Sequence, residues 1–173
     1  MTTVLIDFKE RKIVADNQTT YSKVNGEFLG TSGEDYFYPE KSNKVHPIGD
    51  GAYFVGSGDA FELDRQLAYI IKSKKFLTKP KSSVKIAIVR RKNEGLLVDV
   101  YEAQKSEYLG IKSWKKVITQ GNYQVITFGS GGDYAAGAFM GGCSAEASVI
   151  AASKCDISTG LGITVVEVND GHE

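Results

Sequence analysis

The order of strand-like and helix-like segments is the feature that most restricts the fold of this chain. Short apolar runs predict strands, and apolar residues at helical spacing predict helices. Strands are predicted at 3–8, 12–21, within 44–58, at 84–91 and 96–102, within 108–128 and at 163–168; helices are predicted at 60–71, 133–142 and 144–154. Helices that cover sheets in this order predict an α+β layered sandwich, and 173 residues suit one domain spanning 1–173.

Apolar spacing also predicts which face of each helix is buried. In the first helical segment the predicted face comprises Leu63, Leu67, Ile70 and Ile71. In the last helical segment it comprises Ala147, Ile150 and Ala151, with Ser144 as the expected N-cap. The segment from 22 to 43 is rich in Gly, Ser, Glu and Tyr, and we expect a hairpin or loop there.

Composition argues against some partners. Lys plus Arg and Asp plus Glu are equal at 21 each, so no net field favours nucleic acid or an anionic membrane. The basic run at 72–81 is interpreted as a solvated helix end and loop, with nucleic-acid contact as the less favoured alternative. Cys143 and Cys155 lie among small apolar residues, which predicts buried free thiols. Charges within 2–12 are unlike a signal peptide, so a cytoplasmic location is expected.

The usual catalytic residue sets are poorly represented. The chain has two histidines, His46 and His172, and Ser130 lies in FGSGGD rather than in a GxSxG elbow. No HExxH motif or metal-ligand spacing occurs, so we predict no metal and no cofactor. The GSGG turn before a helix could cradle an anion, but it lacks the Walker lysine and the Rossmann spacing.

An unusual nucleophile is available at the start of the chain. If Met1 is removed, Thr2 carries both a hydroxyl and a free α-amine. Such a threonine can use its own amine as general base, so no histidine is required. An α-amino pKa of about 7.7–8.0 suits that task. The strand expected to start at Thr3 would hold the terminus rigid, which the chemistry needs.

Several segments in order resemble the proteasome β-subunit and HslV family of N-terminal nucleophile hydrolases. The TT start precedes VADNQTT, which is similar to the second strand of that family and ends at Asp16. KVHPIGDGAYFVGSGDAF is similar to the family's lysine strand and first helix, with Lys44 as the lysine. ITFGSGGDYAAGA places Ser130 in the serine position. SKCDISTGLGITVVEV is similar to the β-subunit pattern, and places Asp156 and Thr159.

This resemblance implies a four-layer αββα sandwich, with two antiparallel sheets face to face and helices outside. It implies that Thr2 attacks the substrate and that the Lys44 charge lowers the pKa of the nucleophile, while Asp16 orients Lys44. The other implied site residues are Ser130 and Asp156 around the Thr2 amine and hydroxyl, Thr159 behind them, and the backbones of Gly56 and Gly131 near the oxyanion.

Two assignments stay open. The lysine is open because the segment between Asp16 and Lys44 is longer than the family usually has, and the oxyanion amide is open because the strand end near Gly56 aligns in more than one way. Lys41 is an alternative to Lys44. Val55 is an alternative to Gly56 for the oxyanion amide. The additional residues, about 23–38, are expected to form an enlarged hairpin or loop.

The resemblance implies a threonine-type endopeptidase that acts on polypeptides within a homo-oligomeric ring or stacked rings, fed by an ATP-dependent unfoldase. The Gly- and Ala-rich helices after Asp133 would supply packing surfaces between rings. If Met1 is retained, the α-amine belongs to Met1, and the alternative is an inactive structural ring or interaction protein. An amidase acting on a small amide ranks last, because such enzymes usually begin with Cys or Ser.

Overall fold

The computed structural model describes residues 2–23, 36–73, 77–93, 95–105, 112–118 and 123–169. One four-stranded antiparallel sheet has the strand order β10-β1-β2-β11. Its strands are β10 (Val125–Gly129), β1 (Thr3–Asp7), β2 (Lys12–Asp16) and β11 (Ile163–Glu167). The strand that begins directly after Thr2 is therefore paired on both sides, which fixes its start.

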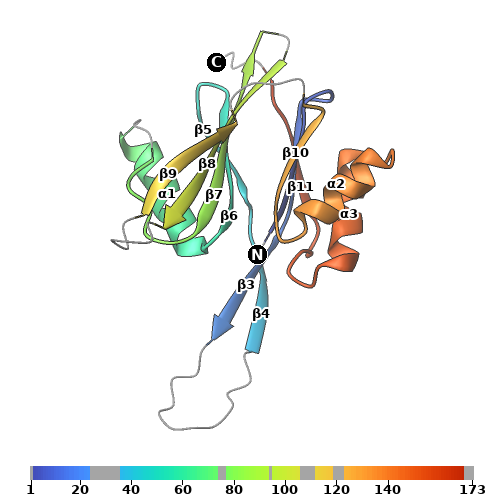
Figure 1. Cartoon of the computed structure of the whole chain (residues 1–173), viewed down its shortest axis with the longest axis horizontal. Coiled ribbons are helices and arrows are strands. Elements are labelled where there is room, and N and C mark those ends of the chain that lie inside the picture. The colour runs from blue at the N-terminus through green and yellow to red at the C-terminus, as the bar shows by residue number, and fades with distance from the viewer. Residues whose placement is uncertain are drawn as a thin grey trace.

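A second, five-stranded sheet has the order β5-β6-β7-β8-β9 and is also antiparallel. Its strands are β5 (Val45–Gly49), β6 (Ala52–Gly58), β7 (Val84–Lys92), β8 (Gly95–Lys105) and β9 (Lys112–Ile118). Helix α1 (Ala60–Ser73) lies outside this sheet, while α2 (Gly132–Met140) and α3 (Ala145–Cys155) lie outside the other (Figure 1). The predicted αββα sandwich is therefore confirmed.

Apolar residues pack in three clusters that follow these layers. The largest lies between the sheets and includes Val4, Ile6, Val55 and Val89. Another joins the first sheet to α2 and α3, and the third joins the second sheet to α1. Residues of β1 alternate between the first two clusters, with Val4 and Ile6 in one and Leu5 in the other. Both faces of β1 are therefore buried, and its position is tightly determined.

The predicted strand at 12–21 is divided at Asn17. The Asn17 N–H donates to the carbonyl oxygens of Gly160 and Gly162, and its own carbonyl accepts from the Ser42 N–H. Beyond this point β3 (Gln18–Lys23) pairs with β4 (Tyr36–Lys41) as a hairpin that projects from the body of the sandwich (Figure 1). The pairing agrees with the hairpin alternative, while residues 24–35 of the expected enlargement lie outside the described part of the chain.

The predicted buried face of α1 is right except at one position. Leu63, Leu67 and Ile70 pack on the second sheet, but Ile71 is 58% exposed. The buried face instead extends to Glu62 and Gln66, which are polar. The Gln66 side chain donates to Glu62 at 2.8 Å and accepts from the Thr78 N–H at 2.9 Å. These hydrogen bonds allow polar side chains to occupy positions that hydrophobicity alone does not indicate.

The predicted face of α3 is wrong. Ala147 and Ile150 are exposed and Ala151 is only partly buried, while the buried residues are Ala145, Ser148, Val149 and Ala152. Ser148 tolerates burial because its hydroxyl donates to the Ser144 carbonyl at 2.7 Å. The predicted N-cap is confirmed, since Ser144 Oγ accepts from the Ala147 N–H at 3.2 Å.

Cys143 and Cys155 are both free, but they are exposed, so the prediction of buried thiols is wrong. Cys143 lies in the turn between α2 and α3, and Cys155 is the last residue of α3. Both positions lie outside the packed face of the helix pair. Within the described residues, no helix has the length and apolar character needed to cross a membrane.

Candidate active site

The start of β1 is held against the loop that follows β10. Thr3 pairs with Gly129 across the sheet. Thr2 directly precedes Thr3, and only 5% of the surface of Thr2 is exposed. Gly129 has a φ of +95°, and a Cβ there would lie 1.7 Å from the Thr2 carbonyl oxygen. Glycine at this position is therefore what permits the close approach of the two chain segments.

Asp16, the last residue of β2, gathers hydrogen bonds from several directions. Its Oδ1 accepts from the Thr3 N–H at 2.6 Å, and its Oδ2 accepts from the N–H groups of Gln18 at 3.0 Å and Gly160 at 3.2 Å. Asp16 is 1% exposed. One buried carboxylate therefore ties together the N-terminal strand, the start of β3 and the loop before β11.

The fourth partner of Asp16 is Lys44, which directly precedes β5. Lys44 Nζ lies 2.9 Å from Asp16 Oδ1 and also donates to the Gln18 carbonyl oxygen. Burial lowers the pKa of Lys44, although the attraction of Asp16 acts in the opposite direction. Lys41, the alternative lysine, is exposed. The structure therefore brings Lys44 to the predicted aspartate.

A second carboxylate, Asp156, organises a chain of hydroxyls after α3. Ser130 Oγ lies 2.5 Å from Asp156 Oδ2, and Thr159 Oγ1 lies 2.7 Å from the same oxygen. The Ser158 N–H donates to Asp156 Oδ1 at 3.0 Å. Burial acts to raise the pKa of Asp156, but the hydrogen bonds from Ser130, Thr159 and Ser158 outweigh it, and the pKa is lowered.

Thr3 connects the two carboxylates, a role that the sequence motifs did not indicate. Its hydroxyl lies 2.6 Å from Thr159 Oγ1, which bonds to Asp156, while its backbone N–H bonds to Asp16. Gln18 was also missed, because it acts on Lys44 through its backbone carbonyl. The paired threonines at the start of the sequence were the only available signal for Thr3.

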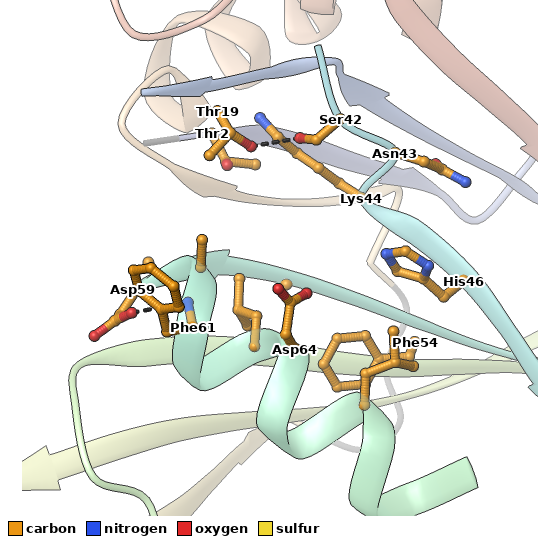
Figure 2. A pocket seen from close by; sticks show the side chains of 15 residues that line it. Thr2, Thr19, Ser42, Asn43, Lys44, His46, Phe54, Asp59, Phe61 and Asp64 are labelled. Carbon is orange, nitrogen blue, oxygen red and sulfur yellow. Dashed lines mark hydrogen bonds between the residues drawn. The ribbon is translucent and has the colours of Figure 1, made fainter. Parts of the chain in front are cut away.

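A cavity of about 300 Å³, here called the Thr2 cavity, lies between the N-terminal strand and α1. Thr2, Lys44 and Gly56 are among the residues that line it. Figure 2 shows the Lys44 side chain extending towards Thr2 and Thr19. Val55, the alternative to Gly56, is fully buried in the core between the sheets.

Gly131 has a different environment from the one expected of an oxyanion residue. A Cβ at this position would lie 2.0 Å from Thr3 Oγ1 and 2.8 Å from Thr159 Oγ1. Gly131 is not part of the lining of the Thr2 cavity. The absence of a side chain at Gly131 leaves room for the contact between the Thr3 and Thr159 hydroxyls.

Solved structures with a similar arrangement of sheets and helices identify the fold. Eukaryotic HslV from Trypanosoma brucei superposes with a TM-score of 0.54 and 17% identity, covering 95% of this chain and 97% of that one. The chain has the fold of HslV. BPH from Thiobacillus denitrificans in complex with epoxomicin gives a TM-score of 0.53 and 17% identity, covering 97% of this chain and all of that one.

The likeness to HslV is one of structure. No protein-family model matches the sequence, and no curated protein sequence matches it either. The resemblance inferred from the sequence motifs is thus confirmed at the level of the HslV-like, N-terminal nucleophile hydrolase fold.

Proposed function

We propose that this protein is a threonine-type peptidase whose nucleophile is Thr2 Oγ1, freed at the chain terminus by removal of Met1. The observation that carries the proposal is that Thr2 and Lys44 line one cavity while Lys44 is held by a buried aspartate. The HslV-like fold supports it, as does the recorded complex of the similarly folded BPH with epoxomicin. Met1 itself lies outside the described residues.

The proposed reaction begins when Thr2 Oγ1 attacks the scissile carbonyl carbon and its proton passes to the Thr2 α-amine. The oxyanion would accept a hydrogen bond from the backbone N–H of Gly56, where β6 borders the cavity. The C–N bond then breaks, the α-ammonium gives its proton to the leaving amine, and an ester remains. Water hydrolyses this ester with the α-amine again acting as base.

Lys44 and Asp16 would support the first step. A cation beside the hydroxyl favours the alkoxide that forms during attack. Since Lys44 is buried and bound to Asp16, its position is fixed before substrate arrives. The second carboxylate group acts indirectly in this proposal. Ser130 and Thr159 both bond to Asp156, and Thr159 in turn bonds to Thr3, the residue after the nucleophile.

The proposed setting is a homo-oligomeric ring, or stacked rings, supplied with unfolded polypeptide by an ATP-dependent unfoldase in the cytoplasm. A peptidase with a freely accessible site would cleave proteins indiscriminately, and enclosure of the site prevents this. Tyr134 and Met140 on α2 and Ile150 on α3 are exposed apolar residues that a neighbouring ring could cover.

The test is hydrolysis of short fluorogenic peptides and of a chemically unfolded protein, with products identified by mass spectrometry. Thr2→Ala should abolish cleavage, whereas Thr2→Ser, which keeps a hydroxyl and an amine, should retain part of it. Cleavage by Thr2→Ala at the wild-type rate contradicts the proposal. So does absence of cleavage by wild-type protein that has lost Met1.

A further inference from the structure

The Thr2 cavity has one end near the proposed nucleophile and another formed by α1. Thr2 and Lys44 lie on one wall, and Asp59, Phe61 and Asp64 lie on the other (Figure 2). A volume of about 300 Å³ is at the low end for ligand pockets, and suits one side chain rather than a whole ligand. A substrate residue whose carbonyl reaches Thr2 would place its side chain in this space.

Asp64 gives the cavity a negative charge with no countercharge of its own. Figure 2 shows its carboxylate pointing from α1 into the cavity. Among the described residues it has no hydrogen bond or ion pair to another side chain. The neighbouring Asp59 is engaged differently, because its Oδ1 accepts from the N–H groups of Phe61 at 3.0 Å and Glu62 at 3.3 Å at the start of α1.

The positive charge on the opposite wall is already paired. Lys44 Nζ lies 2.9 Å from Asp16, which is outside the cavity lining. Lys44 therefore does not neutralise Asp64. The remaining charge in the cavity favours a cationic group close to α1.

The surface beside Asp64 is apolar. Phe54, Leu63 and Leu67 line the cavity on the β6 and α1 side. Lysine and arginine side chains complement this surface. Their methylene stem packs on apolar surface, and their positively charged head lies beyond it. Asp64 is an exposed residue, so a purely apolar substrate side chain would leave water as the partner of its carboxylate and would gain nothing from the charge.

We propose that the Thr2 cavity selects substrates with lysine or arginine on the amino side of the cleaved bond, with Asp64 pairing with the cationic head. The inference rests on the proposed function, since it takes Thr2 as the nucleophile. Glutamate at this position is disfavoured by Asp64 and Asp59 together.

The experiment uses three peptide epoxyketones that differ only in the residue bearing the epoxyketone: arginine, leucine or glutamate. The rate of adduct formation at Thr2 is followed by intact mass. The arginine probe should react faster than the leucine probe, and Asp64→Asn should reduce that ratio about two- to fivefold, as for an exposed ion pair. Asp64→Lys should make the glutamate probe faster than the arginine probe.

Glu167→Gln is the matched control, since it also removes one exposed carboxylate charge. Glu167 pairs with Lys12 at the end of β11 remote from Asp16, and is not part of the cavity lining. It should leave the arginine-to-leucine ratio unchanged. Faster reaction of the leucine probe, with a ratio that Asp64→Asn does not alter, overturns the substrate class alone. Reaction of none of the three probes with protein lacking Met1 overturns the proposed function as well.

Discussion

Asp16 and Asp156 both support the N-terminal strand, but in physically different ways. Asp16 is 1% exposed and accepts from three backbone N–H groups and the Lys44 ammonium. Asp156 is only partly buried, and two of its three donors are hydroxyls, from Ser130 and Thr159. Backbone donors at Asp16 cannot turn away, whereas hydroxyls at Asp156 can rotate towards water.

This difference predicts how each carboxylate contributes to the stability of the fold and to the position of the N-terminal strand. Removal of Asp16 leaves the buried Lys44 ammonium without its countercharge and three buried N–H groups without an acceptor, so the whole fold depends on it. Removal of the Asp156 charge leaves hydroxyls that can find other partners. Asp16 is therefore expected to determine stability, and Asp156 the fine position of Thr3 and, through it, of Thr2.

Asp16→Ala should produce the largest effect, lowering the free energy of unfolding by about 3–5 kcal/mol. Urea denaturation followed by circular dichroism measures this change. The double variant Asp16→Ala with Lys44→Met, which also removes the unpaired cation, should be more stable than Asp16→Ala alone. If the double variant is the less stable of the two, the buried charge pair is not the source of the effect.

Gly131→Ala should have the next largest effect, a loss of about 1–3 kcal/mol from overpacking. Its Cβ would lie 2.0 Å from Thr3 Oγ1, so Thr3 and Thr159 must separate. Gly137→Ala is the matched control within α2, because a Cβ there meets nothing within 4 Å. The control should raise stability by about 0.5–1 kcal/mol. Equal effects of the two substitutions would show that Gly131 is not tightly packed.

Asp156→Asn should cost about 1 kcal/mol at pH 7, the smallest of the three losses. Because the folded protein lowers the pKa of Asp156, the charged form stabilises the fold above the unfolded pKa of about 3.9. This contribution is lost as the pH falls through the folded pKa. Denaturation curves of wild type and variant should therefore converge in acid. A difference that stays constant with pH would exclude ionisation of Asp156 as its cause.

Much of the fold followed from the sequence because the order of strands and helices depends on local periodicity. The buried faces of the helices were predicted less well from the sequence. Glu62, Gln66 and Ser148 are buried because hydrogen bonds satisfy their side chains, and apolar periodicity does not detect such bonds. The break at Asn17 depends on backbone contacts with Gly160 and Gly162, which are remote in sequence. Such contacts could not be anticipated from one segment alone.

The candidate site shows the same limit. The side chains named from the motifs do meet, as Asp16 with Lys44 and as Ser130 with Asp156 and Thr159. The missed contributions are the N–H and the hydroxyl of Thr3, the Gln18 carbonyl and the space at Gly131. All but the Thr3 hydroxyl come from backbone atoms or from an absent side chain. The charge at Asp64 became significant only when α1 placed it in the Thr2 cavity.

The role of Thr2 as nucleophile is tested by the intact mass of the purified protein before and after incubation with epoxomicin. An epoxyketone requires both the hydroxyl and the free amine of a terminal threonine. If Thr2 is the nucleophile, the mass lacks Met1 and a single adduct forms that is absent from Thr2→Ala. Protein that lacks Met1 and forms no adduct, or an adduct that persists in Thr2→Ala, would contradict it.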